Sequence, residues 1–352
     1  MNRSALGWTV GIAGGAMTLA RALNRRRRRI DLGGRVAIIT GGSRGLGLEL
    51  ARQLADQGAE LALVARTAGD LERAHAELLA ERGCDALAIA ADVGRPGAMD
   101  KVVEEVLAHH GRVDILINCA GVMLVAPLDH LEPDDYARAM AAHFWGPLHA
   151  MNAVIPVMRR QGGGRIVNIS SIGGRVAVPH MLPYSASKFA LTGLSDGLGA
   201  ELAREGIRVT TVWPWLMRTG SHLNIDLKGR HREELTWFSL AASLPVLTMS
   251  PRRAAARILD ACRHGDRHLT LGMLARLAIA ASAIAPELVA DLMAAGNRLL
   301  PAPAGSPAGD LERSARASSD RLPRALTRLG ERAALRHNQL RGGSPAAPSL
   351  HR

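Results

Sequence analysis

Apolar runs of strand length recur between residues 35 and 271 and alternate with segments of helical period. Most runs are apolar almost throughout, which is typical of strands buried on both faces of a sheet. The intervening segments, such as LGLELARQLADQG, repeat apolar positions every three to four residues and end at glycine. This alternation predicts an α/β, doubly wound Rossmann fold: a single, mostly parallel sheet of about seven strands flanked by helices. The predicted strands are residues 35–40, 60–65, 86–91, 113–118, 165–170, 207–213 and, last, 268–271.

The first strand-to-helix turn reads TGGSRGLG, residues 40–47. Its glycines allow a tight turn and let a pyrophosphate approach the helix N-terminus, where free N–H groups and the helix dipole favour an anion. A glycine cluster alone is a weak signal, but this one follows the first strand of a parallel-sheet pattern. We therefore predict that Gly41, Gly45 and Gly47 hold a dinucleotide.

The second predicted strand ends in LVAR, and Arg66 stands where a site that prefers a free ribose 2′-hydroxyl carries an acid. A second arginine, Arg44, lies within the glycine loop. Two guanidinium groups suit a 2′-phosphate, which accepts charge-assisted and bidentate hydrogen bonds. The pair predicts NADP(H) rather than NAD(H). The alternative is two surface arginines in an arginine-rich chain.

Only two tyrosines and three lysines occur, and one of each falls in the pentapeptide YSASK, Tyr184 to Lys188. Positions i and i+4 share one helix face, so the ammonium group is expected beside the phenol. Such a charge favours the phenolate and lowers the pKa of the phenol from about 10, which would make Tyr184 a general acid and base. Ser171 directly follows the strand RIVNIS, at an edge that lines the ligand crevice in such sheets.

Together these motifs resemble those of the short-chain dehydrogenase/reductase family. They stand here in the family's order as TGGSRGLG (40–47), Asp92-Val93, NCAG (118–121), NISS (168–171), YSASK (184–188) and VWPWLMRT (212–219). The resemblance covers residues 35 to about 270, roughly three-quarters of the chain. It implies an enzyme that interconverts a ketone or aldehyde and an alcohol, and homodimers or homotetramers are usual in the family.

The resemblance also implies site residues. Ser171 would orient the carbonyl, Tyr184 would exchange the proton, and Lys188 would bind the nicotinamide ribose as well as tuning Tyr184. The implied cofactor residues fall into four groups. Those around the phosphates are Gly41, Ser43, Arg44, Gly45, Leu46, Gly47 and Arg66, and those beside the adenine are Asp92 and Val93. The cofactor floor would be formed by Asn118, Ala120 and Gly121, and the nicotinamide would be bound by Pro214, Leu216 and Thr219, with Tyr184 and Lys188.

Three positions depart from the family pattern. Many members carry an asparagine where His143 stands in AAHFWGP (141–147), and it holds a water in a proton relay with the lysine. We expect His143 to replace it, because imidazole both donates and accepts hydrogen bonds; the alternative is a packing histidine. Trp215 replaces the glycine of a Pro-Gly pair, and Cys119 replaces an asparagine without a redox role.

The substrate side is the least specified part of the chain. Residues 220–250 form the segment after the nicotinamide loop, where Trp215, Trp237 and Phe238, with Leu240 and Leu244, would give an apolar wall. Core packing explains such residues equally often. The hypothesis is a bulky apolar or lipid-like carbonyl substrate.

The net charge of +12 lies entirely in the two ends of the chain, because residues 30–302 carry 28 basic and 28 acidic side chains. A nucleic-acid-binding domain concentrates basic residues on a folded face, so we expect no nucleic-acid partner. The expected divisions are an N-terminal segment (1–30), a catalytic domain (31–272), two amphipathic helices (273–300) and a basic, largely disordered tail (301–352). Three cysteines without paired spacing predict a reduced compartment and no metal site.

Residues 4–20 carry no charge, and Arg21 and Arg25–Arg29 come directly after them. A helix of this length is slightly short of a hydrocarbon core of ~30 Å, and positive residues on its C-terminal side keep the rest of the chain in the cytoplasm. We predict a membrane-associated N-terminus whose arginines contact anionic headgroups, with the catalytic domain cytoplasmic; the alternative is an apolar tail that does not insert. The helices expected in 273–300 would cover the core or lie on a membrane surface.

Two other functions remain open at this point. One is a 3-oxoacyl-thioester reductase of lipid synthesis, which predicts a basic patch for an acidic carrier protein. The other is a nucleotide-binding scaffold without turnover, for which the changes at His143 and Trp215 leave room.

Overall fold

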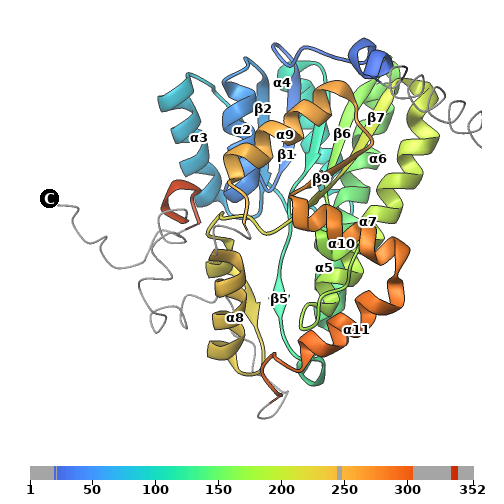
Figure 1. Cartoon of the computed structure of the whole chain (residues 1–352). Helices are drawn as coiled ribbons and strands as arrows, with labels where there is room; N and C mark the ends of the chain where they lie inside the picture. The colour runs from blue at the N-terminus through green and yellow to red at the C-terminus, as the bar shows by residue number, and fades with distance from the viewer. Residues whose placement is uncertain (1–19, 21, 244–247, 304–333, 340–352) are drawn as a thin grey trace, which may run out of the picture.

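The computed structural model describes residues 20, 22–243, 248–303 and 334–339 (Figure 1). Its centre is a seven-stranded sheet in the order β3-β2-β1-β4-β6-β7-β9, with every neighbouring pair parallel. The predicted doubly wound fold is confirmed. The strands are β1 (Val36–Thr40), β2 (Glu60–Ala65), β3 (Leu87–Ala90), β4 (Ile115–Asn118), β6 (Gly164–Ile169), β7 (Ile207–Pro214) and β9 (His268–Leu271).

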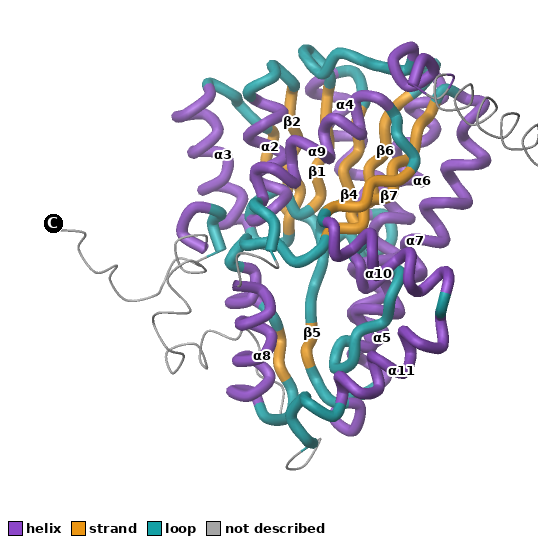
Figure 2. The backbone as a smooth tube through the Cα atoms, in the orientation of Figure 1, coloured by secondary structure: helices purple, strands orange, loops and turns teal. Residues whose placement is uncertain are grey.

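Helices cover both faces of this sheet, as the backbone tube of Figure 2 shows. One apolar cluster joins the sheet to α2 (Gly45–Ala55), α3 (Ala68–Arg82) and α9 (Pro251–His264). A second cluster joins the opposite face to α4 (Ala98–His110), α6 (Gly146–Arg160) and α7 (Leu182–Glu201). The inner strands are apolar on both sides because each side meets a helical layer.

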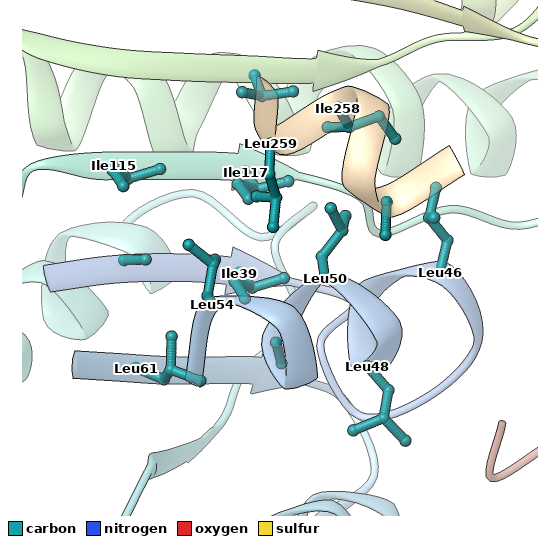
Figure 3. Packing of buried hydrophobic residues seen from close by; sticks show 14 of the residues in the cluster. Ile39, Leu46, Leu48, Leu50, Leu54, Leu61, Ile115, Ile117, Ile258 and Leu259 are labelled. Carbon is teal, nitrogen blue, oxygen red and sulfur yellow. The ribbon is translucent and has the colours of Figure 1, made fainter. Parts of the chain in front are cut away.

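The first of these clusters fixes the start of α2, and with it the glycine loop. Leu50 and Leu54 of α2 pack with Ile258 of α9 over Ile39 and the neighbouring strands, and all of these side chains are fully buried (Figure 3). Burying such a side chain contributes about 1.5–3 kcal/mol each. The phosphate-binding end of α2 is therefore held by a rigid core.

A smaller lobe extends beyond the carboxyl ends of the strands. It contains α5 (Pro133–Met140), α8 (His231–Ser243) and a two-stranded sheet of β5 (Leu124–Val125) and β8 (Asp226–Leu227). Its own apolar cluster includes Val125, Met181 and Phe238, with Tyr184 packed against it. The lobe thus forms one wall above the sheet edge.

The two expected C-terminal helices are present as α10 (Met273–Ile284) and α11 (Pro286–Asn297). They do not cover the core: α11 has no buried residue, and α10 buries only Ala275. Large apolar side chains on them are exposed, including Ile284 at 84% and Leu288 at 59%. Their predicted position on a membrane surface stays a prediction.

The arginine cluster is partly engaged by the catalytic domain. Arg25 forms ion pairs with Asp260 and Asp266, at 2.6 and 2.9 Å, and the Arg28 carbonyl accepts a hydrogen bond from Arg165. The Arg25 guanidinium therefore lies against the end of α9, and the predicted contact of the arginines with anionic headgroups stays a prediction. No helix among the described residues is long and apolar enough to cross a membrane; of residues 4–20, only Ala20 is described.

One part of the C-terminal tail is ordered against the domain. Residues 334–339 begin with a helical turn and bury Ala334, His337 and Gln339. The prediction of a largely disordered tail is wrong for this segment, because it packs on the glycine loop. The flanking residues 304–333 and 340–352 lie outside the described residues.

Candidate active site

The strand register brings the sequence motifs to one edge of the sheet. Thr40 is paired with Asn118, and Asn118 with Asn168, so the segments that follow β1, β4 and β6 begin side by side. The glycine loop follows Thr40, the NCAG segment begins at Asn118, and Ser171 lies three residues after Asn168. A crevice at the carboxyl ends of the strands is where such sheets bind ligands.

Buried polar side chains hold these segments in place. The Thr40 hydroxyl accepts hydrogen bonds from the backbone amides of Cys119 and Ala120, at 3.2 and 3.3 Å. The Asn118 amide donates to Asn168 Oδ1 at 2.8 Å, and the Asn168 amide donates to Ser195 of α7 at 2.9 Å. This chain of bonds ties the predicted cofactor floor to the catalytic helix.

The glycine loop fits a dinucleotide on steric grounds. A Cβ atom on Gly47 would lie 2.1 Å from the Gly41 carbonyl oxygen, so the first turn of α2 approaches the loop more closely than any other residue allows. Gly45 has a φ of +61°, which favours glycine. The first amides of a helix have no acceptor within the helix and can bind a phosphate.

The catalytic helix α7 places Tyr184 against the loop that follows β6. A Cβ on Gly173 would lie 3.2 Å from the Tyr184 ring, and the Ser171 hydroxyl accepts the Gly173 amide at 3.1 Å. Ser171 lies close enough to lower the pKa of Tyr184 through a side-chain hydrogen bond. The structure thus brings these two side chains together, and their catalytic roles stay predictions.

Lys188 lies one turn along the same helix, and its Nζ is 5.7 Å from the Tyr184 ring centre. Nζ donates a hydrogen bond to the Ile169 carbonyl at 2.8 Å. Burial lowers the pKa of Lys188 from 10.5 to about 8. The ammonium is thus held at the sheet edge beneath the phenol.

The expected lowering of the Tyr184 pKa does not occur in this structure. Burial raises the pKa of the phenol above 10, and the hydrogen bond with Ser171 lowers it only in part. Burial of the phenol is the largest cause of this rise, and the Lys188 ammonium donates its hydrogen bond to the Ile169 carbonyl. Tyr184 is therefore protonated at neutral pH, which is the form that donates a proton to a carbonyl oxygen.

His143 lies in a π-helical turn, Ala141–Trp145, between α5 and α6. Its Nε2 accepts the Val122 amide at 3.1 Å, so the proton of the neutral ring is on Nδ1, which faces Ser187 Oγ at 2.8 Å. Burial and the nearby Lys188 ammonium lower the pKa of His143 well below 6.5. Both ring nitrogens are engaged, so this geometry favours the packing alternative over the water relay.

A close approach by glycine makes room for this ring. A Cβ on Gly121 would lie 2.9 Å from Nε2 of His143, and the ring meets Tyr184 edge-on with centroids 5.3 Å apart. His143 thus contacts the cofactor floor on one side and the catalytic phenol on the other.

The remaining predicted cofactor residues surround the same edge. Arg66 is exposed and makes no hydrogen bond or ion pair with another described residue, whereas Arg44 contacts Asn224 at 3.4 Å. Asp92 Oδ1 accepts the Gly94 amide, and the Val93 side chain is buried in the core. The remaining predicted residues follow or flank the strand ends: Ser43, Leu46, Pro214, Leu216 and Thr219.

The proposed apolar wall is only partly made of accessible side chains. Phe238 is 4% exposed, so it packs within the lobe. Trp237 is half-buried in the same cluster as Tyr184, and Trp215 packs beside Gly272. Leu240 and Leu244 lie outside the residues whose side chains the structure describes.

Sequence reasoning missed a buried polar group in this lobe. Glu234 is fully buried, accepts the indole N–H of Trp237 at 2.7 Å, and lies 2.9 Å from Nδ1 of His180. A charge at an apolar position of α8 was the available signal. Thr40 and Asn168 were also missed; polar residues inside apolar strands could have marked them.

The cysteines and acidic residues form no metal site among the described residues. Burial raises the pKa of Cys119 to about 11, so its thiol is protonated and unreactive at neutral pH.

Comparison with known proteins settles the family. The family model for short chain dehydrogenases matches residues 35–228. The chain belongs to the short-chain dehydrogenase family. Dehydrogenase/reductase SDR family member 7B of Bos taurus is 31% identical to this short-chain dehydrogenase over 81% of the chain and 88% of the relative.

Two further relatives have stated activities. D-threitol dehydrogenase of Mycolicibacterium smegmatis is 36% identical over 53% of this chain and 72% of the relative. The crystal structure of L-sorbose reductase from Gluconobacter frateurii, complexed with NADPH and L-sorbose, matches with a TM-score of 0.62 and 27% identity over 70% of this chain and 99% of that one. This short-chain dehydrogenase is accordingly an oxidoreductase of CH–OH and carbonyl groups, and the NADPH-bound neighbour supports the cofactor prediction.

Proposed function

We propose that this short-chain dehydrogenase interconverts a ketone or aldehyde and an alcohol with NADP(H), using Tyr184 as general acid and base. The contact between Tyr184 and Ser171 at the sheet edge, with Lys188 beneath, is the observation that carries the proposal. NADPH, when bound, supplies a hydride to the carbonyl carbon. Ser171 binds the carbonyl oxygen, and the protonated phenol of Tyr184 gives it a proton, so an alcohol forms.

The cofactor assignment rests on Arg44 and Arg66, and on the absence of an acid at the end of β2. Both arginines can reach a 2′-phosphate from the loops that follow β1 and β2. A structural relative that is complexed with NADPH adds support.

Replacing Tyr184 with phenylalanine tests the reaction. Tyr184→Phe removes the proton donor and keeps the ring, so we expect carbonyl-dependent NADPH oxidation to fall by about 10²-fold or more while NADPH still binds. The chain's only other tyrosine gives a matched control, since Tyr136→Phe on α5 should keep full activity. Unchanged turnover in Tyr184→Phe would reject the mechanism. An absence of turnover in the parent protein and in both variants would favour the scaffold alternative.

We further propose an apolar or lipid-like substrate. The wall beside Tyr184 is formed by Met123, Val178 and Trp237 over a core of Val125, Met181 and Phe238. The relatives named for D-threitol and L-sorbose make small polyols and their ketoses the second candidate. A panel that runs from erythrulose and sorbose to long-chain and sterol ketones decides between them, and activity confined to the small ketoses would overturn the apolar proposal.

A membrane-associated N-terminus remains part of the proposal. Arg26, Arg27 and Arg29 stay exposed beside the apolar run, whereas Arg25 is held by Asp260 and Asp266. We expect the full chain to float with vesicles that contain anionic lipid and a chain lacking residues 1–24 to remain unbound. Equal flotation of both proteins would show that the membrane contact lies outside residues 1–24.

A further inference from the structure

The ordered tail segment, residues 334–339, lies against the loop that the proposed function assigns to the cofactor. Figure 1 draws it in red below α3, far in sequence from the residues it contacts. Its side chains are buried: Ala334 is 0%, Gln339 4% and His337 5% exposed. Such burial indicates a built docking site.

The segment takes one of the donors at the start of α2. The Gly45 amide donates a hydrogen bond to the His337 carbonyl oxygen at 2.8 Å. The Asn338 side chain donates to the Ser43 carbonyl at 2.8 Å and to the Asp70 carbonyl at 3.2 Å. A carbonyl oxygen of the tail thus accepts the hydrogen bond of an amide at the helix end where an anion would bind.

The segment also contacts the loop that follows β7, on the other side of the crevice. A Cβ on Gly220 would lie 2.5 Å from Ala334 Cα, so the two backbones touch. The Asn224 amide donates to Gln339 Oε1 at 2.7 Å and to its carbonyl at 3.0 Å. Asn224 in turn accepts from Arg44 at 3.4 Å, which directs this arginine toward the tail-bound loop.

Two arginines of the outer helices complete the docking site. Arg52 of α2 donates to the Arg336 carbonyl at 2.7 Å and is itself held by Glu49 and Glu77. Arg73 of α3 donates to Asn338 Oδ1 at 3.1 Å. Backbone and side-chain groups of the tail are therefore both recognised.

We propose that residues 334–339 are an intramolecular ligand of the glycine loop that competes with the dinucleotide. The proposal rests on the proposed NADP(H) site, because the docked tail uses the Gly45 amide directly and Arg44 through Asn224. Two ligands that need the same groups oppose each other reciprocally. A tail docked in about 90% of molecules raises the apparent Kd for the cofactor about tenfold.

Cofactor titration of the full chain and three variants tests this competition. The variants are a chain that ends at residue 333, Asn338→Ala, which removes the bonds to Ser43, Asp70 and Arg73, and Leu335→Ala as the matched control. Leu335 belongs to the same segment but is 63% exposed. NADPH and NADH fluorescence give Kd, and hydrogen exchange of residues 334–339 is followed with and without cofactor.

We expect the truncation to lower the Kd for NADPH about tenfold and Asn338→Ala to lower it about threefold, with Leu335→Ala unchanged. Saturating cofactor should speed exchange in residues 334–339 of the full chain. An unchanged or higher Kd in both tail variants, or slower exchange with cofactor, overturns the competition. The proposed NADP(H) preference can fail independently of this competition: it fails if NADH binds more tightly than NADPH. Both cofactors contain the pyrophosphate, so either one would report the competition with the tail.

Discussion

The Nδ1 atom of His143 lies 2.8 Å from Ser187 Oγ, and that hydroxyl donates to the Tyr184 carbonyl at 2.9 Å. His143 is therefore coupled to the backbone of the catalytic residue rather than to a solvent path. Because Nε2 accepts the Val122 amide, the ring is neutral in the folded protein. Its effect should appear in stability against pH.

The first prediction concerns the pH dependence of folding. The pKa of His143 is lowered on folding, so an unfolded chain binds the proton below about pH 6.5 while the folded chain does not. The contribution of His143 is thus present above pH 6.5 and is lost as the pH falls, with a slope of up to about 1.4 kcal/mol per pH unit. We expect His143→Gln to flatten the fall in the free energy of unfolding between pH 6.5 and 5, measured by urea unfolding.

Exposed His109 provides the control for this measurement. His109→Gln on α4 should retain the slope of the parent protein. A variant at His143 with the parent slope would mean that the buried ring takes up a proton in the folded state.

The second prediction separates function from stability at Lys188. Burial lowers its pKa from 10.5 to about 8, which corresponds to roughly 3 kcal/mol against the charged form. Lys188→Met removes this charge and keeps the length, so we expect a Tm equal to or higher than the parent's, with turnover reduced by about 10²-fold or more. Differential scanning calorimetry and initial rates measure both, and exposed Lys101→Met is the control. A clear loss of stability in Lys188→Met would show that the bond to Ile169 outweighs the burial of the charge.

The third prediction concerns cofactor choice at the end of β2. Arg66 is exposed and forms no ion pair with the described residues, so a 2′-phosphate would not have to displace one. Arg66→Asp should raise the KM for NADPH by about tenfold or more and lower that for NADH, because an acid repels the phosphate and accepts the ribose hydroxyls. Arg160→Asp makes an equal charge change on the exposed end of α6 and should leave the ratio of the KM values for NADPH and NADH unaltered. A NADPH preference that survives Arg66→Asp would leave Arg44 as the sole determinant.

The fourth prediction concerns the buried Glu234 on α8. Removal of its carboxylate leaves the Trp237 indole N–H and His180 without their partner in a buried position, at a cost of about 3 kcal/mol. Glu234→Ala should lower the Tm and raise the KM for the carbonyl substrate, since Trp237 lies in the cluster beside Tyr184. Glu234→Gln keeps an acceptor for the indole, so its Tm and its KM should lie between those of the parent protein and Glu234→Ala. Equal KM values in all three proteins would exclude this lobe from the substrate site.

The amino-acid sequence by itself determined the sheet and the chemistry it carries. Apolar runs predicted the inner strands, which are buried on both faces, and the edge strand at residues 268–271 was also located correctly although it is only partly buried. The spacing of Tyr184 and Lys188 placed both on one face of α7, and strand ends placed Ser171 beside them. These features depend on local periodicity, which a sequence contains.

Only the tertiary structure decided the states of the groups and the contacts between distant segments. The direction of the Lys188 ammonium depends on a carbonyl of β6, and the raised pKa of Tyr184 depends on burial of the phenol. Whether His143 bridges a relay or packs depends on Val122 and Ser187, and the docking of His337 at Gly45 joins segments almost 300 residues apart. Burial and hydrogen-bond direction are set by the whole fold, so no pattern along the chain specifies them.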